Sequence, residues 1–173
     1  MWYTKDTKEE EKLKEVTIMK KIYFDMDGTV ADLYGSDNWL DNLRNERNGV
    51  FNNLFPLVDM DKLAMVCHRL MNNGYSFGII TWLPMGASYE YERVCEQEKR
   101  EWANEFMPWV SEFYAQSYGV PKQYAPIKRA ANMVLVDDNT EVRAMWNTEK
   151  QRTSIDATKN IIEELKKLLD NDD

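Results

Sequence analysis

The chain has 173 residues, of which 43% are hydrophobic and 30% are charged, and its formal net charge is −8 at pH 7. This length supports one domain with a substantial core and leaves room for a small insertion, while the negative charge argues against strong nucleic-acid binding. Because the sequence has no secretory signal and no apolar stretch long enough to span a bilayer, we expect a cytoplasmic protein without a membrane partner.

The first 18 residues differ in composition from the rest of the chain. The segment "MWYTKDTKEEEKLKEVTI" is rich in charge and includes an acidic run at residues 9–11. Segments of this kind are solvated and seldom contribute to a core. We therefore expect residues 1–18 to form an N-terminal extension and residues 19–170 to form the folded domain.

Short apolar runs alternate with helical patterns over the rest of the chain. The runs predict strands at residues 21–26, 75–81, 112–116 and 133–136, with a weaker one at 154–157. Helical spacing of apolar residues predicts helices at residues 59–73, 89–106, 139–146 and 157–169. Most of the strands lack period-two alternation, which is typical of strands buried on both faces of a parallel sheet. This order of elements predicts a doubly wound, Rossmann-like α/β fold with about five strands.

Polar side chains follow three of the predicted strands at the point where each strand ends. Asp25 and Asp27 lie in "FDMDGT" after the first strand, Thr81 ends the second, and Asp137 and Asp138 follow the fourth. In open parallel sheets, ligands bind outside the carboxyl ends of the strands. We therefore expect these five residues to meet at one edge of the sheet.

Several other residues have structural interpretations. A second DxD, at Asp59 and Asp61, has no DGT after it and directly precedes a helical pattern, which indicates helix-start residues. Cys67 and Cys95 lie in helical surroundings without a CxxC motif, so we expect both to be reduced and buried. The single histidine, His68, lies within a predicted helix and receives no role.

The segments "FDMDGT", "GIITW", "PK" and "VLVDDN", in this order, resemble the signature of the haloacid-dehalogenase-like (HAD) phosphohydrolase superfamily. The resemblance covers about residues 19–170. Within the superfamily, "DLYGSDNWLDNLRNE" and "GVPKQYAPIKRAANMVLVDDN" look like a bacterial and phage branch related to the 5′(3′)-deoxyribonucleotidases. The resemblance implies an enzyme that hydrolyses phosphomonoesters, with a nucleoside monophosphate as the first candidate substrate.

The resemblance and the chemistry of the residues together suggest roles for the acidic groups. Asp25 is the expected nucleophile, and Asp27 is the expected general acid and base. Mg²⁺ prefers oxygen ligands, so it suits Asp25, the backbone carbonyl of Asp27, and the pair Asp137 and Asp138. The resemblance favours Asp138 as the direct ligand of that pair, with Asp137 behind it or sharing the ion.

A phosphate site needs donors and a positive charge. Thr81 and the backbone amide of Trp82 are the expected donors to the phosphoryl oxygens. Two lysines remain candidates for the positive charge: Lys122 matches the resemblance, whereas Lys128 lies closer to the acidic pair in sequence. Because the resemblance continues into "EKREW", three cations on the helix at 89–106 are further candidates to face the site, without an assigned role: Arg93, Lys99 and Arg100.

The resemblance also implies a small helical cap inserted after the first strand, at about residues 33–74. Three aromatic residues of this segment, Trp39, Phe51 and Phe55, can either stack on a nucleobase or form the core of the cap itself. Two further hypotheses stay open. One is a phosphatase for another small molecule or for nucleic-acid ends, and the other is a non-catalytic protein that binds a metal or phosphate.

Overall fold

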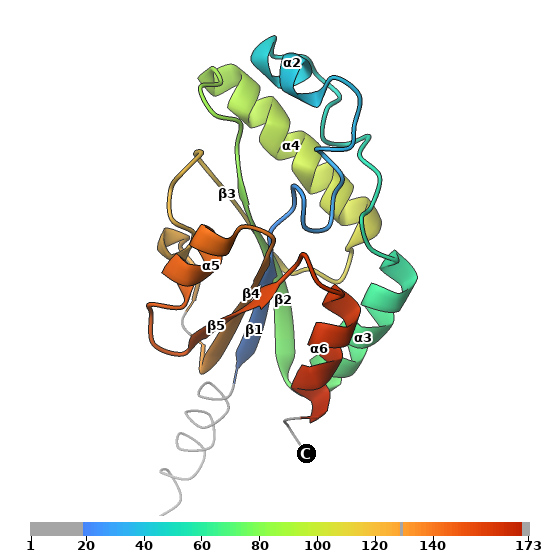
Figure 1. Ribbon diagram of the computed structural model, residues 1–173, viewed down its shortest axis with the longest axis vertical. Coiled ribbons are helices and arrows are strands. Elements are labelled where there is room, and N and C mark those ends of the chain that lie inside the picture. The colour runs from blue at the N-terminus through green and yellow to red at the C-terminus, as the bar shows by residue number, and fades with distance from the viewer. Residues whose placement is uncertain (1–18, 129, 171–173) are drawn as a thin grey trace, which may run out of the picture.

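A computed structural model describes residues 19–128 and 130–170, so the N-terminal extension expected at residues 1–18 lies outside the described residues. The described chain contains a five-stranded sheet in the order β3-β2-β1-β4-β5, with every neighbouring pair parallel (Figure 1). Its strands are β1 (Lys20–Phe24), β2 (Tyr75–Trp82), β3 (Glu112–Gln116), β4 (Asn132–Asp137) and β5 (Arg152–Asp156).

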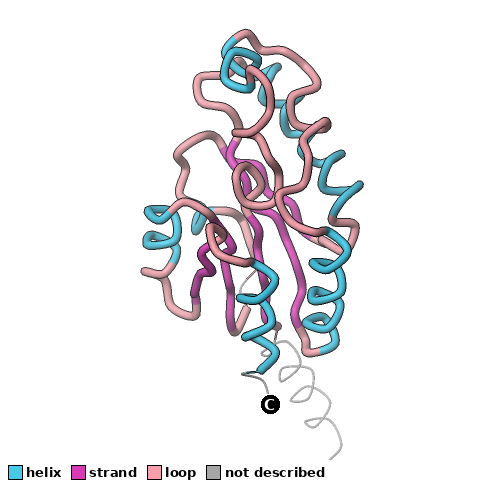
Figure 2. The backbone as a smooth tube through the Cα atoms, turned by 45° about the vertical axis from the view of Figure 1, so that its right-hand side comes forward, coloured by secondary structure: helices cyan, strands magenta, loops and turns pink. Residues whose placement is uncertain are grey.

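Helices flank the sheet on both faces (Figure 2). The helices of the described chain are α2 (Trp39–Arg44), which lies beyond the end of the sheet (Figure 1), α3 (Met60–Asn72), α4 (Tyr89–Phe106), the 3₁₀ helix η1 (Lys122–Tyr124), α5 (Thr140–Trp146) and α6 (Ile161–Asp170). Buried residues of α3, α4 and α6 share one apolar cluster with alternate residues of the central strands, and α5 packs in a second cluster on the opposite face. This arrangement confirms the predicted doubly wound α/β fold.

The predicted strands are all present, and their bounds differ from the prediction by at most two residues. The largest difference among the helices concerns α6, which begins four residues later than expected. Asp156 explains this difference, because its carboxylate accepts hydrogen bonds from the backbone amide and the hydroxyl of Thr158, at 3.0 and 2.7 Å. The resulting turn competes with helix formation until Ile161.

Helices α3 and α5 begin at side chains that cap their first turns. Asp59 precedes α3 and accepts a hydrogen bond from the amide of Lys62 at 3.1 Å, which confirms the helix-start interpretation of the second DxD. Asn139 precedes α5 and accepts from the amides of Glu141 and Val142 at 2.9 and 3.2 Å. Each cap satisfies amides that the first turn of a helix leaves without partners.

The segment expected to form the cap divides into two parts. Helix α3 buries Leu63, Val66 and Leu70 in the main core and lies beside α6 (Figure 1), so it belongs to the helical layer on the sheet and not to the cap. The remaining stretch, residues 33–58, contains only the six-residue helix α2, none of whose residues is buried. We call residues 33–58 the cap segment. Helix α3 joins the core because it carries a strong apolar stripe, although it lies within the range of residues expected for the cap.

The described residues also test two of the simpler expectations. Cys67 and Cys95 are both free and buried, as predicted, and burial raises the pKa of each thiol to about 12. No helix within residues 19–128 and 130–170 has the length and apolar character needed to cross a membrane.

Candidate functional site

The site lies where the chain changes direction across the sheet. From β1 the chain first adds β2 and β3 on one side, and it then returns to add β4 and β5 on the other. The adjacent strands β1 and β4 therefore flank a topological switch point, which is where open α/β sheets bind ligands. Asp25 directly follows β1, Asp137 ends β4, and Asp138 comes next.

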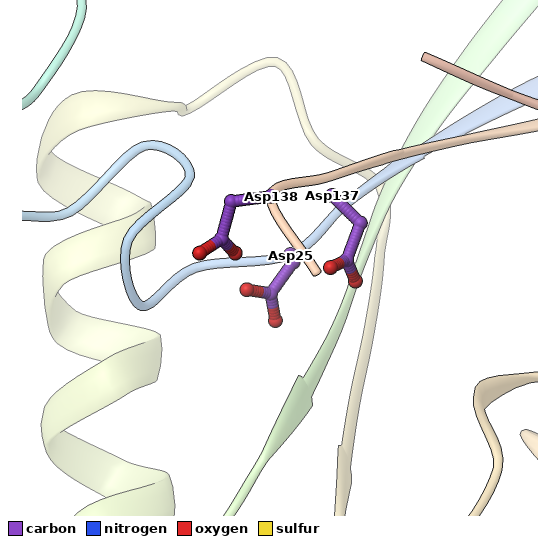
Figure 3. Close-up of side chains that lie close together, drawn as sticks. All are labelled: Asp25, Asp137 and Asp138. Atoms are coloured by element: carbon purple, nitrogen blue, oxygen red, sulfur yellow. The ribbon is translucent and has the colours of Figure 1, made fainter. Parts of the chain in front are cut away.

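The three carboxylates at this switch point form an acidic cluster. Asp25, Asp137 and Asp138 each offer a carboxylate oxygen, and these oxygens all lie within 4.8 Å of one another (Figure 3). Such close carboxylates repel each other unless a cation or a proton lies between them. The ends of β1 and β4 therefore lie together, as predicted. The cluster offers the hard oxygen donors that divalent cations prefer.

Lys122 supplies a positive charge inside this cluster. Its Nζ donates to Asp25 Oδ1 at 2.5 Å and to Asp137 Oδ2 at 2.6 Å, and the side chain is only 2% exposed. Burial by itself would lower the pKa of Lys122, but the carboxylates of Asp25 and Asp137 outweigh burial and raise it. Lys128 is exposed and does not line the site cavity. Of the two candidate lysines, the structure brings only Lys122 to the carboxylates.

Trp82 orients the loop that precedes Lys122. Its indole Nε1 donates to the Val120 carbonyl at 2.7 Å, and its ring centroid lies 5.1 Å from that of Tyr118 and 5.6 Å from Lys122 Nζ. The side chain of Trp82 thus forms a wall of the site and packs against the lysine loop. The role expected for the backbone amide of Trp82 stays a prediction.

The two adjacent aspartates after β4 have different partners. Asp137 is 1% exposed, and both of its oxygens are engaged: Oδ2 by Lys122 and Oδ1 by the amide of Asn139 at 2.8 Å. Asp138 is half-buried, and its Oδ1 accepts from the Thr29 hydroxyl at 3.2 Å. Oxygen Oδ2 of Asp138 lies next to Gly28 and accepts no hydrogen bond from the described residues. Asp138 is therefore the member of the pair with an oxygen available to a ligand.

The cluster carries more negative charge than Lys122 balances. Burial and the charge of Asp25 raise the pKa of Asp137 to about 6, although Lys122 opposes this shift. Burial and Asp25 also raise the pKa of Asp138. A bound divalent cation would relieve this excess, and the donor set fits such a cation because all three groups are carboxylates.

Gly28 allows the turn after β1 to pass close to the cluster. Its φ is +80°, which residues with a side chain rarely adopt, and a Cβ there would lie 2.5 Å from Cε2 of Tyr34 and 2.9 Å from Asp138 Oδ2. Both conformation and space therefore require glycine at this position.

Asp27 and Thr81 meet through a residue to which the sequence assigned no role. Lys99 of α4 is 0% exposed, and its Nζ donates to Asp27 Oδ2 at 2.5 Å and to Thr81 Oγ1 at 2.9 Å. The other two open candidates point elsewhere: Arg93 donates to the Tyr89 hydroxyl, and Arg100 donates to Glu96. A signal for Lys99 exists in the sequence, because it lies four residues after Cys95 on the buried side of an otherwise charged helix.

The carboxyl group of Asp27 lies in a desolvated position. Burial raises its pKa, the charge of Lys99 lowers it, and the net shift is upward. Oxygen Oδ1 of Asp27 is buried and has no hydrogen-bond partner among the described residues. A carboxyl group in this state can carry a proton into a dry site.

A cavity of about 400 Å³ opens at this site, and neither Thr81 nor Lys99 lines it. Its polar lining includes the acidic cluster, Asp27 and Lys122, and most of its other lining residues are apolar or aromatic. Trp39 and Phe51 line the cavity as expected, whereas Phe55 is 81% exposed and does not. Tyr34 and Tyr118, which received no role from the sequence, also line it. Phe51 is buried in the main core as well, and stacking of its ring on a nucleobase stays a prediction.

The site thus combines an acidic cluster that can accept a cation with aromatic lining residues, and two buried lysines donate to its aspartates. Comparisons of the sequence with protein-family models and with curated proteins find no match. The chemistry of the site therefore has to be inferred from its residues and their geometry. Carboxyl groups held in different environments beside a possible cation site are suited to transfer of a charged group such as phosphoryl.

Proposed function

We propose that this protein is a Mg²⁺-dependent phosphatase that hydrolyses small phosphomonoesters through an aspartyl-phosphate formed on Asp25. The observation that supports this most directly is the contrast between the two aspartates of the "DMD" turn. Asp25 lies in the acidic cluster and is paired with Lys122, whereas Asp27 keeps one buried oxygen without a partner among the described residues. Two adjacent carboxyl groups in different environments suit a nucleophile and a proton carrier.

The reaction has two steps. In the first, a carboxylate oxygen of Asp25 bonds to phosphorus as the bond from phosphorus to the ester oxygen breaks, and Asp27 gives its proton to the leaving oxygen. In the second, Asp27 takes a proton from a water molecule whose oxygen bonds to phosphorus, and the bond from Asp25 to phosphorus breaks. The products are the alcohol and inorganic phosphate, and both carboxyl groups return to their starting states.

Asp25, Asp138 and the backbone carbonyl of Asp27 would hold Mg²⁺, which when bound supplies positive charge to the carboxylates and to the phosphoryl oxygens. Asp137 acts indirectly, because its contacts with Lys122 and with the Asn139 amide orient the lysine. Lys122 offsets the charge of the nucleophile and offers a remaining N–H to a phosphoryl oxygen. Thr81 and the amide of Trp82 are the further proposed phosphate donors.

The proposed substrate is a nucleoside monophosphate, for which the aromatic wall is the supporting observation. Trp39, Tyr34 and Tyr118 line the same cavity as the carboxylates, and stacking a base on such side chains contributes about 1–3 kcal/mol per base. A volume of about 400 Å³ lies within the range of small-molecule pockets. The half-exposed α2 segment forms one side of the opening and would select the leaving group.

Phosphate release from a substrate panel tests this proposal. The panel contains nucleoside monophosphates, sugar phosphates and a phosphorylated oligonucleotide end, each assayed with Mg²⁺ and with EDTA. We expect hydrolysis of a monoester in Mg²⁺ only, and loss to background in Asp25→Asn. The matched control is Asp61→Asn, which alters an exposed aspartate of the second DxD and should retain full activity.

The outcomes separate the open hypotheses. If only sugar phosphates or only the oligonucleotide end are hydrolysed, the substrate belongs to that class and the nucleotide proposal is wrong. If no substrate is hydrolysed while Mg²⁺ still raises the melting temperature, the protein binds metal without catalysis and the phosphatase proposal is wrong.

A further inference from the structure

Lys99 approaches the site from α4, whereas the three clustered carboxylates come from the ends of β1 and β4. Its side chain is fully buried, and its Nζ lies 4.4 Å from the centroid of the Phe51 ring. A buried ammonium is costly unless its donors are used, and Lys99 uses two of them on Asp27 and Thr81. A fully buried lysine between two groups of one site suggests a function beyond packing.

The chemistry of the ammonium group determines how both partners are oriented. Lysine offers only donors, so the Thr81 hydroxyl oxygen must act as the acceptor of the bond from Lys99. The hydroxyl hydrogen of Thr81 is then free to donate to another oxygen. On Asp27 the lysine engages Oδ2, which leaves Oδ1 as the oxygen without a partner among the described residues.

We propose that Lys99 is a positioning residue that holds Asp27 with Oδ1 toward the ester oxygen and turns the Thr81 hydroxyl toward a phosphoryl oxygen. This inference rests on the phosphatase function proposed above. Lys99 acts on the proton carrier, whereas Lys122 acts on the nucleophile, because the two lysines bond to different aspartates. Their losses should therefore have different kinetic signatures.

The expected kinetic signature of losing Lys99 is a fall in kcat/KM that depends on the leaving group. An ester of a basic alcohol needs a proton from Asp27 as its bond to phosphorus breaks, whereas an ester of an acidic phenol leaves without one. The value of kcat/KM covers the steps up to formation of the phosphoenzyme, so it reports this proton transfer. Misplacing Asp27 should therefore lower kcat/KM most for the esters with basic leaving groups.

The test uses Lys99→Met and a series of ring-substituted phenyl phosphates that differ in leaving-group acidity but hardly in shape. We expect kcat/KM to fall about 100-fold for the most basic phenol and only about threefold for p-nitrophenol, as for a misoriented general acid. Lys99→Gln keeps an N–H for Asp27 and serves if the methionine variant does not fold. It should show the same trend with a smaller loss. Adding Asp27→Asn to Lys99→Met should cause little further loss.

Arg100→Gln is the matched control, because Arg100 is the next residue on α4 but pairs with Glu96 and lies over Phe113. Its leaving-group dependence should equal that of the wild type. An equal fall of kcat/KM across the series in Lys99→Met would overturn the positioning role and leave Lys99 as a phosphate-binding or structural group. If the wild type hydrolyses no phosphate ester at all, the phosphatase proposal itself fails, which is a distinguishable result.

Discussion

Single residues of this site are constrained by conformation, space and charge together, and Gly28 shows how. Its positive φ brings the turn after β1 close to Asp138. A Cβ at this position would clash with the Tyr34 ring. Lys122 is constrained by charge, since it is buried between Asp25 and Asp137. Replacing either residue therefore affects the site through a named contact.

Gly28→Ala should weaken the site as well as the fold. A side chain at φ +80° is strained, and its Cβ would press on Tyr34 and on the free oxygen of Asp138. We expect a loss of about 1 kcal/mol or more in the free energy of unfolding. We also expect a smaller rise of the melting temperature on adding Mg²⁺, measured by calorimetry with and without the ion.

Gly74→Ala is the control for backbone strain alone. Gly74 has φ +85°, nothing lies within 4 Å of a Cβ placed there, and it precedes the opposite end of β2. It should lose comparable stability but keep the full Mg²⁺-dependent rise. Equal Mg²⁺ responses in both variants would contradict the proposed contact between Gly28 and the metal site.

At the scale of elements, one row across the sheet links β1, β2 and β3. Tyr23, Gly78 and Glu112 are paired in register, and a Cβ on Gly78 would lie 2.5 Å from the Tyr23 ring. Because Gly78 has no side chain, Tyr23 of β1 reaches across β2 and donates to Glu112 of β3 at 2.7 Å. Lys21, which is buried, donates to the same carboxylate at 2.5 Å. This network ties the edge strand β3 to the centre of the sheet.

Glu112 should make stability depend on acidic pH. Burial alone would raise the pKa of Glu112, but hydrogen bonds from Lys21 and Tyr23 lower it below its ordinary value of 4.5. The folded state therefore binds this proton more weakly than the unfolded chain does. The ionised carboxylate stabilises the fold above about pH 4.5, and this contribution is lost as the pH falls through the lowered pKa of the folded state.

Glu112→Gln tests this linkage by urea unfolding at several pH values. At pH 7 we expect a loss of about 3 kcal/mol, because Lys21 is left buried without its charged partner. The difference from the wild type should shrink as the pH falls below about 4.5. Glu105→Gln, at an exposed position of α4, should differ little from the wild type at every pH. A constant difference for Glu112→Gln down to low pH would contradict the assigned pKa shift.

At the scale of the whole molecule, α4 holds much of the cap segment in place. Along one side of this helix, Tyr91 donates to the Arg47 carbonyl at 2.6 Å and Trp102 donates to the Leu54 carbonyl at 2.8 Å. Between them, the Glu98 carboxylate accepts from the amides of Gly49 and Phe51. In contrast, α2 buries no residue, so the firmly attached part of the cap segment is its second half. The next residue after Glu98 is Lys99, so one turn of α4 contacts both the cap segment and Asp27.

Glu98→Gln should loosen this attachment. The amide side chain keeps one acceptor oxygen in place of two, so one of the two cap amides loses its partner, at a cost of about 1–3 kcal/mol. We expect faster hydrogen exchange at residues 49–51, measured by NMR or mass spectrometry. Glu96→Gln, which changes a partly exposed pair with Arg100 on the same helix, should leave exchange in this segment unchanged. Unchanged exchange in Glu98→Gln would show that the cap segment is held by other contacts.

Much of the fold could be predicted from the sequence because burial on both sheet faces leaves continuous apolar runs, and capping groups mark helix starts. The strands at 75–81 and 112–116 and the start of α3 at Asp59 follow from such local patterns. The late start of α6 was not predicted, because apolar spacing does not report the hydrogen bonds from Thr158 to the Asp156 carboxylate that form the turn before the helix. The apolar stripe of α3 places it in the core, whereas its position beside α6 depends on an element that lies far away in sequence.

The sequence by itself determined which residues stand at the carboxyl ends of the strands, because parallel strands place those ends at a common edge. Asp25, Asp137 and Asp138 follow from that rule. Only the tertiary structure decided between Lys122 and Lys128, excluded Phe55 from the cavity and brought Lys99 to Asp27. The physical reason is that periodicity reports which face of an element is buried, whereas contact between side chains 72 residues apart depends on how whole elements pack.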